Sequence, residues 1–229
     1  KKINIPPSLI KIEKNAFFQC NDLQIEMPNN SELSIIEENA FGNANFETFV
    51  FSSKLSNEYN NFINNIQYSK IYLCPNPNYT WYNEYMLAKS SPEKENFDVL
   101  LLVVNVNKTA RIPLYIENIE KYAFLRYDDV KQVDIPINSR LQIIGIFAFA
   151  HSTIESINIP PSLTQIGDYA FYNCQKLLYI DIVTDNLTIG ENAFAKSFLN
   201  RIFISTNHLT IKEDAFSECK NLRFFEVSP

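Results

Sequence analysis

The sequence predicts an α/β repeat solenoid, in which short coils of chain stack along one axis. The first observation is a repeated phrase: Ile5–Cys20 reads IPPSLIKIEKNAFFQC, and Ile159–Cys174 reads IPPSLTQIGDYAFYNC. The second is the Ala-Phe dipeptide, whose successive copies lie 24, 83, 25, 22, 23 and 22 residues apart. Its alanines are Ala16, Ala40, Ala123, Ala148, Ala170, Ala193 and Ala215. A fixed period of this length is typical of stacked repeats, each too small to cover its own apolar face.

Each repeat begins with a predicted short strand. Runs such as VKQVDIP (Val130–Pro136) and IESINIP (Ile154–Pro160) end in alternating apolar residues, the period-2 signature of a strand. A proline ends several of these runs, because it cannot donate a hydrogen bond to a neighbouring strand. A second apolar pair, such as Leu163 and Ile166, then points inward. In the Ala-Phe pair that follows, the small alanine permits close approach and the phenylalanine fills the interior.

One strand in every repeat of about 20–29 residues predicts a leucine-rich-repeat horseshoe. We expect the strands to pair in parallel, about 4.8 Å apart, as one sheet on the concave face. The Ala-Phe segments are expected to form short helical or 3₁₀ turns on the convex face.

Two phrases carry a more specific resemblance: IPPSLTQIGDYAFYNCQKL, from Ile159, and LQIIGIFAFAHSTIESINIP, from Leu141. They resemble the pattern LxxIxIPxxVxxIxxxAFxxC of the BspA-like leucine-rich repeat family, found in bacterial surface proteins and in large surface-protein families of parasitic protists. The likeness, which we assign to the protist type, covers residues 1–56 and 107–229. It implies a cell-surface or secreted protein, whereas the repeat itself encodes only the scaffold.

The repeats predict a single solenoid over the whole chain. Its regular repeats span 1–56 and 107–229, and a degenerate or inserted segment spans 57–106. Residues 75–97 depart from the pattern and are expected to hold a loop and a short helix around Tyr79–Ala88. Two interpretations stay open: an insertion that the scaffold tolerates, or a recognition loop. The candidate residues of that loop are Tyr79, Trp81, Tyr82 and Tyr85, of types enriched in interface hot spots.

Composition argues against several classes of function. The 229-residue chain is 46% hydrophobic, which is ample for a sizeable core, and its net charge is −6. A mildly acidic surface argues against nucleic-acid binding, which needs clustered Lys and Arg. The longest apolar run, Val99–Val104, is too short for direct membrane insertion. Because the chain starts inside a repeat at Lys1 and carries no signal peptide, we expect it to be a fragment.

The sequence holds no recognisable catalytic or metal-binding pattern. Cys20, Cys174 and Cys219 occupy one slot, three residues after the phenylalanine of Ala-Phe, in repeats that are not neighbours. That placement argues against disulfides among them, and we interpret them as core residues. The histidines, His151 and His208, have no partner at catalytic spacing, and no CxxC pair occurs. We therefore predict no enzymatic activity, no catalytic residue, no metal site and no cofactor.

The outward residues of the predicted strands are the candidate binding surface. Apolar residues point inward, so the residues between them form columns on the concave face. The candidates are Arg111, Asp134, Asn158, Tyr179, Asp181, Arg201, Phe203, Phe224 and Glu226. They are either ordinary solvated positions or a surface that binds a protein or glycan, since exposed aromatic residues and Arg are typical anchors. A cation site on Asp134 and Asp181 is a third interpretation, although these carboxylates would lie about 10 Å apart.

The predicted function is a non-enzymatic protein-binding or adhesion module of a cell-surface protein, which recognises host cells, matrix or other microbes. The resemblance implies this function, and the alternative is an intracellular leucine-rich-repeat scaffold that binds a protein partner. Self-association is also expected, because uncapped solenoid ends expose apolar faces and sheet edges. Four sequons either arise by chance or carry glycans outside the cell: Asn29, Asn78, Asn107 and Asn186.

Overall fold

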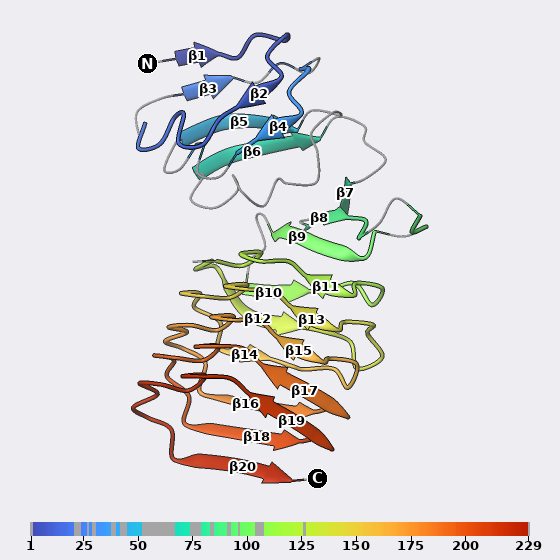
Figure 1. Cartoon of the computed structure of the whole chain (residues 1–229), viewed down its shortest axis with the longest axis vertical. Coiled ribbons are helices and arrows are strands. Elements are labelled where there is room, and N and C mark those ends of the chain that lie inside the picture. The colour runs from blue at the N-terminus through green and yellow to red at the C-terminus, as the bar shows by residue number, and fades with distance from the viewer. Residues whose placement is uncertain are drawn as a thin grey trace. The chain divides into compact units, whose positions relative to one another are not determined.

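The structure, a computed structural model (Figure 1), describes most of the chain. The described residues are 2–20, 24–26, 28, 31–37, 40–41, 45–51, 67–73, 79–82, 85–90, 93–95, 97–103, 108–125 and 127–228. The chain divides into two compact units, Lys1–Thr80 and Trp81–Pro229. That both belong to a single solenoid stays a prediction.

The first unit contains two parallel sheets. The larger has the order β1 (Lys2–Asn4), β3 (Gln24–Glu26), β5 (Asn45–Phe51) and β6 (Gln67–Leu73). The smaller pairs β2 (Lys11–Ile12) with β4 (Ile35–Ile36). Ile12 lies opposite Ile36, and both are buried. The ring of Phe17 stacks on that of Phe41, with ring centroids 5.3 Å apart. The Ala-Phe turns of these two successive coils are therefore in contact, as are their strands.

The second unit contains two columns of short strands (Figure 1). The first column holds two three-stranded parallel sheets: β10 (Lys108–Arg111), β12 (Val130–Asp134) and β14 (Ser156–Ile157), then β16 (Tyr179–Val183), β18 (Arg201–Ser205) and β20 (Phe224–Ser228). The second column is one sheet in the order β19 (His208–Ile211), β17 (Asn186–Ile189), β15 (Gln165–Ile166), β13 (Ile143–Ile144), β11 (Asn118–Ile119), β9 (Val99–Val103), β8 (Tyr85–Ala88) and β7 (Tyr79–Tyr82). Of β7, only Trp81 and Tyr82 belong to the second unit. The predicted parallel pairing is confirmed, but each regular coil contributes two strands where the sequence predicted one.

Alternating burial explains both kinds of strand. In β16, Ile180 and Ile182 point inward and are buried, whereas the residues on either side of them are exposed. In the two-residue strand β15, Gln165 is exposed and Ile166 is buried. β-branched isoleucine fits a pleated surface that is packed on one side, so one inward isoleucine is enough to set the register of such a short strand.

The helix expected around Tyr79–Ala88 is wrong, because this segment forms strands β7 and β8. Tyr85, Leu87 and Ala88 are 3%, 1% and 1% exposed, so β8 contributes three buried residues to the core. Strand β8 pairs antiparallel with the apolar strand β9, which supplies the backbone partners that a helix would have supplied internally.

The Ala-Phe segments form tight turns, and the described residues contain no helix, so the expected helical or 3₁₀ convex face is also wrong. Within one such turn the N–H of Ala150 donates to the carbonyl oxygen of Phe147 (3.2 Å). The N–H of Phe149, however, donates to Ala170 in the following coil (2.8 Å). Phe147 and His151 have φ values of 54° and 59°, in the left-handed region. A right-handed helix cannot include residues in that conformation, which is the physical reason for the difference.

Hydrogen bonds join neighbouring coils in both directions. At the Ala-Phe turn the donor belongs to the earlier coil: the N–H of Phe171 donates to Ala193 (2.7 Å). Directly after the second strand the donor belongs to the later coil: the N–H of Gly190 donates to Ile166 (2.8 Å). Neighbouring coils are therefore held together by backbone N–H donors from both coils.

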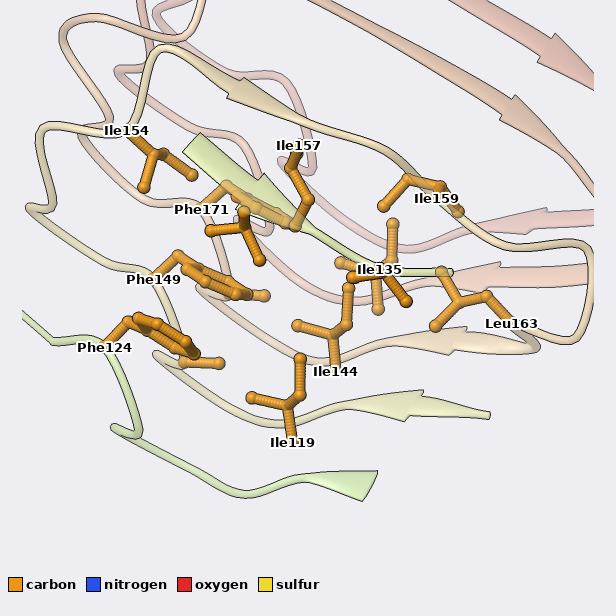
Figure 2. Packing of buried hydrophobic residues seen from close by; sticks show 14 of the residues in the cluster. Ile119, Phe124, Ile135, Ile144, Phe149, Ile154, Ile157, Ile159, Leu163 and Phe171 are labelled. Atoms are coloured by element: carbon orange, nitrogen blue, oxygen red, sulfur yellow. The ribbon is translucent and has the colours of Figure 1, made fainter. Parts of the chain in front are cut away.

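A ladder of stacked phenylalanine rings runs through the interior of the second unit (Figure 2). Successive centroids along Phe124, Phe149, Phe171, Phe194 and Phe216 lie 4.6, 5.1, 5.0 and 5.3 Å apart. Isoleucines from both strand columns lie beside the rings (Figure 2). The prediction that these phenylalanines fill the interior is confirmed for Phe41, Phe124, Phe149, Phe171 and Phe194, whereas Phe17 and Phe216 are only partly buried.

Glycine occurs where two coils approach most closely. A Cβ atom on Gly167 would lie 2.8 Å from the carbonyl carbon of Gly145 and 2.8 Å from the nitrogen of Ile146, both in the preceding coil. Real Cβ atoms do not tolerate such contacts with backbone, so a side chain at this position would push the coils apart.

Candidate recognition face

The outward side chains of β16, β18 and β20 form a compact group that we call the aromatic face. It comprises Tyr179, Asp181, Arg201, Phe203, Phe224 and Glu226. The strand register places Tyr179, Arg201 and Phe224 in one row across the three strands, and Asp181, Phe203 and Glu226 in the next. Tyr179 and Phe224 are 54% and 53% exposed, so two large rings flank a cationic side chain at the surface.

An ion pair links two neighbouring strands at the centre of the aromatic face. The guanidinium nitrogen Nη2 of Arg201 lies 2.8 Å from Oδ1 and 2.9 Å from Oδ2 of Asp181, on the neighbouring strand. Both side chains are about half exposed, so the pair contributes little to stability. It directs the guanidinium group of Arg201 toward Asp181 in the next row, where the opposite charges of the two side chains offset each other.

The remaining predicted strand residues lie in the same outward column. Arg111 is exposed and lies opposite Asp134 in the register of β10 and β12. Gln132 donates to Asp134 (3.1 Å), and the side-chain amide of Asn158 donates to the carbonyl oxygen of Ile135 (2.7 Å). These hydrogen bonds occupy some of the side-chain donors and acceptors of Asp134 and Asn158. That the column binds a ligand stays a prediction.

The aromatic residues of the predicted recognition loop divide into two groups. Tyr85 is 3% exposed and packs in the core of the second unit, which leaves it no surface for a ligand. Tyr79, Trp81 and Tyr82 belong to strand β7, but their side chains lie outside the part of the structure that is described.

The cysteine slot forms an interior column in which cysteine alternates with serine. Cys174 is fully buried and its thiol donates to the carbonyl oxygen of Phe149 in the preceding coil (3.1 Å). The hydroxyl of Ser152, in the same slot of that coil, lies 3.7 Å from the sulfur. Burial raises the pKa of the Cys174 thiol to about 12, despite the hydrogen bond from Ser152. Cys20, Cys174 and Cys219 are all free.

The sequence interpretation missed a group of half-buried aromatic rings at the Ala-Phe turns. The ring of Phe147 stacks on those of Tyr122 and Tyr169, with centroids 5.5 and 4.7 Å away. The Nδ1 atom of His151 lies 2.9 Å from the side-chain nitrogen of Asn173, so its imidazole is held within this surface. The available signal was the residue directly before each Ala-Phe pair, which is aromatic in three successive repeats.

The sequence interpretation also missed a polar groove on the second sheet. It lies on β15, β17 and β19, and its outward residues include Asn186, Thr188, His208 and Thr210. The signal was the repeated alternation in NLTI (Asn186–Ile189) and HLTI (His208–Ile211).

Among the described residues, no group of three His, Cys, Asp or Glu side chains could hold a metal ion. Likewise, the described part of the chain contains no helix long and apolar enough to cross a membrane.

Two columns of parallel strands, joined by Ala-Phe turns around a phenylalanine ladder, define a leucine-rich-repeat solenoid. The chain belongs to the BspA type leucine rich repeat family, whose repeat region matches residues 1–110 and 117–228 in six copies.

Solved structures with the same fold come from bacteria. The crystal structure of the pneumococcal vaccine antigen PcpA has a TM-score of 0.77 and 21% identity over 99% of this chain and 62% of that one. A leucine rich cell surface protein from Faecalibacterium prausnitzii has a TM-score of 0.76 and 23% identity over 100% of this chain and 60% of that one. The chain therefore spans about three fifths of the length of each. None of the curated protein sequences compared with the chain matches it significantly.

Proposed function

We propose that the chain is a non-enzymatic recognition module of a cell-surface protein, and that it binds a protein ligand through the aromatic face. The observation that carries the proposal is the row Tyr179, Arg201 and Phe224, in which the strand register places an ion-paired arginine between two residues with half-exposed rings. Exposed aromatic residues and arginine are the types that dominate binding energy at protein interfaces. Regular strands hold them rigidly, so little conformational entropy is lost on binding.

A surface location is supported by the family and by the description of one structural match as a cell surface protein. The proposal has two finer parts. The ligand lies on host cells, on matrix or on other microbes, and the chain belongs to the protist type of the family.

The alternative is an intracellular scaffold for a protein partner. One observation favours it, because the three described cysteines are free, as is usual in reducing compartments. Burial of the Cys174 thiol would, however, keep it reduced in either compartment.

The absence of catalysis is part of the proposal. The Cys174 thiol, with a pKa of about 12, carries almost no thiolate at neutral pH, and a nucleophilic cysteine needs the thiolate. The imidazole of His151 already interacts with Asn173.

A binding assay with a double variant tests the aromatic face. Phe203→Ala with Phe224→Ala should lower binding to cultured epithelial cells, to immobilised matrix proteins or to bacterial cells by about tenfold, because the rings supply the anchors. Phe198→Ala is the matched control, since this ring is 44% exposed but lies off the face. If the folded double variant keeps full binding wherever the parent binds, or if the parent binds none of these targets, the proposal fails.

Self-association is a second part of the proposal, with another copy of the chain as the partner. Phe225 and Val227 of β20 are 44% and 50% exposed, whereas their register partners on β18, Ile202 and Ile204, are fully buried. Where no further coil covers these positions, burying them against a second copy would be favourable. Light scattering at micromolar concentration should give a mass above that of the monomer, and a monomeric mass would rule the association out.

A further inference from the structure

The polar groove of the second sheet has the size of a ligand site. Its volume is about 600 Å³, and it lies on the outer face of β15, β17 and β19. Ligand sites commonly fall in the range of about 300–1,000 Å³. Unlike the aromatic face, the groove has no Phe, Tyr or Trp among its lining residues.

The strand register builds an ordered array of polar groups in this groove. Asn186 lies opposite His208, and Thr188 lies opposite Thr210 on the neighbouring strand. Leu187, between Asn186 and Thr188, is 2% exposed, so it points inward and its two neighbours point out. An amide, an imidazole and two hydroxyl groups therefore share one rigid face.

These polar side chains have no competing partner among the residues that the structure describes. In the part of the chain that the structure describes, the side chains of Asn186, Thr188, His208, Thr210 and Gln165 make no hydrogen bond to another residue. On the first column of strands, by contrast, the side chains of Asp134, Asn158 and Asp181 all have partners. The groove thus presents donors and acceptors that only solvent or a ligand can satisfy.

The charges around the groove favour a neutral ligand. Its charged lining residue, Lys212, is ion-paired with Asp168 (Nζ–Oδ1 3.3 Å). An anionic ligand would have to compete with Asp168 for that ammonium group. Because the lining includes no carboxylate, a cationic ligand finds no partner in it. A protein ligand would in turn require apolar anchors that this face lacks.

We propose that this groove binds a neutral oligosaccharide laid across β15, β17 and β19. Neighbouring strands lie about 4.8 Å apart, which is comparable with the length of one sugar ring, so successive rings would meet the polar side chains of successive coils. Sugar hydroxyl groups both donate and accept, which matches the mixed hydroxyl, amide and imidazole lining. The groove and the aromatic face lie on different strands, so this inference does not depend on the proposed protein ligand.

The test uses the full chain produced in bacteria, because Asn186 is a sequon and an attached glycan would occupy the groove. The probes are neutral linear hexasaccharides of glucose and of N-acetylglucosamine, with a sialylated oligosaccharide as the anionic comparison. Amide resonances of β15, β17 and β19 should shift with at least one neutral probe, at concentrations where the anionic probe has no effect.

A matched pair of double variants then tests the hydroxyl groups. Thr188→Val with Thr210→Val keeps the shape and the strand preference but removes both hydroxyls, and should weaken binding by about tenfold. Thr188→Ser with Thr210→Ser keeps the hydroxyls and should bind within about twofold of the parent. If the valine variant fails to fold, Asn186→Ala with His208→Ala removes the other two groups and should show the same loss.

Three outcomes would overturn the inference: no neutral probe shifts the groove resonances, the anionic probe binds better, or the valine and serine variants bind equally well. The aromatic-face variant Phe203→Ala with Phe224→Ala separates the two proposals. It should retain oligosaccharide binding, whereas it should lose cell or matrix binding.

Discussion

The rings of Phe171 and Phe194 are parallel within 1°, and their centroids lie 5.0 Å apart. They come from successive coils and both are fully buried. The same slot of each coil thus packs on the same slot of the next, so that the interior of the second unit is built from like-on-like contacts. A change at one slot is therefore felt by both neighbouring coils.

Phe171→Ala should reduce the free energy of unfolding of the second unit by about 3–5 kcal/mol, because the cavity would lie between two other rings. Urea denaturation followed by circular dichroism measures the loss. Phe198→Ala, at a ring that is 44% exposed, is the control and should cost much less. Equal losses in the two variants would contradict the interior ladder.

Gly167→Ala should destabilise the second unit by about 1–3 kcal/mol, because the new methyl group would lie 2.8 Å from backbone atoms of the preceding coil. Lys212→Ala is the matched control, since Lys212 occupies the same slot of a later coil and already carries a Cβ atom there. Thermal unfolding of both variants separates the two cases. A melting temperature unchanged by Gly167→Ala would show that the coils are not in such close contact.

Glu218→Gly should stabilise the chain slightly, by about 0.5 kcal/mol, because Glu218 has φ 54° and glycine adopts this conformation without steric cost. The ion pair with Lys196 that is lost is exposed and contributes little. Glu213→Gly, directly before Asp214 but with an ordinary φ, should destabilise instead. Chemical denaturation compares the two variants, and the prediction is wrong if their effects have the same sign.

Ser90→Ala should lower stability at neutral pH and make it less dependent on pH in the acid range. Burial alone would raise the pKa of Asp98, but hydrogen bonds from Ser90 and the ammonium group of Lys94 hold it below its ordinary value of 3.8. A carboxyl whose folded-state pKa is lowered stabilises the fold above the unfolded pKa, and this contribution is lost as pH falls through the folded pKa. The backbone bond from residue 90 remains, so the variant should lose only part of this contribution.

The measurement for Asp98 is an NMR titration of its side-chain carboxyl carbon, combined with stability between pH 2 and pH 7. In Ser90→Ala the pKa of Asp98 should rise, and the stability difference from the parent should be largest at neutral pH and shrink below about pH 4. A difference that is constant over this range would assign the effect of Ser90 to packing.

Cys174 should resist alkylation in the folded protein. A pKa of about 12 leaves roughly one thiol in ten thousand as thiolate at pH 8, and burial excludes the reagent as well. Iodoacetamide treatment followed by peptide mass mapping should find Cys174 unmodified under native conditions and modified in urea. Rapid native labelling would place this thiol at the surface.

The repeat pattern predicted the inward-facing residues well, because the interior between the strands is the one place where the isoleucine, leucine and phenylalanine side chains of each repeat can be buried. It did not predict the second sheet, since strands such as Gln165–Ile166 have two residues and cannot display a period. It also did not predict the left-handed residues Phe147 and His151, because propensity favours glycine or asparagine there and stacking between coils decides instead.

The candidate site was only partly predictable. Alternation along Tyr179–Val183 was enough to place Tyr179 and Asp181 on the outer face. The ion pair of Asp181 with Arg201 depends on the register between strands, which sequence spacing suggests but does not determine. The polar groove was not predicted, because its threonines belong to a second sheet that the pattern did not reveal.

The two directions of hydrogen bonding between coils also determine the electrostatic character of the solenoid axis. In an α-helix all peptide dipoles point the same way and leave partial charges at the ends. Here the N–H of Phe171 points to the following coil and that of Gly190 to the preceding one, so their dipoles oppose each other along the axis. The stack consequently has no macrodipole of the helical kind, and it can lengthen coil by coil without accumulating charge at either end. Attraction of a charged ligand would have to come from side chains alone.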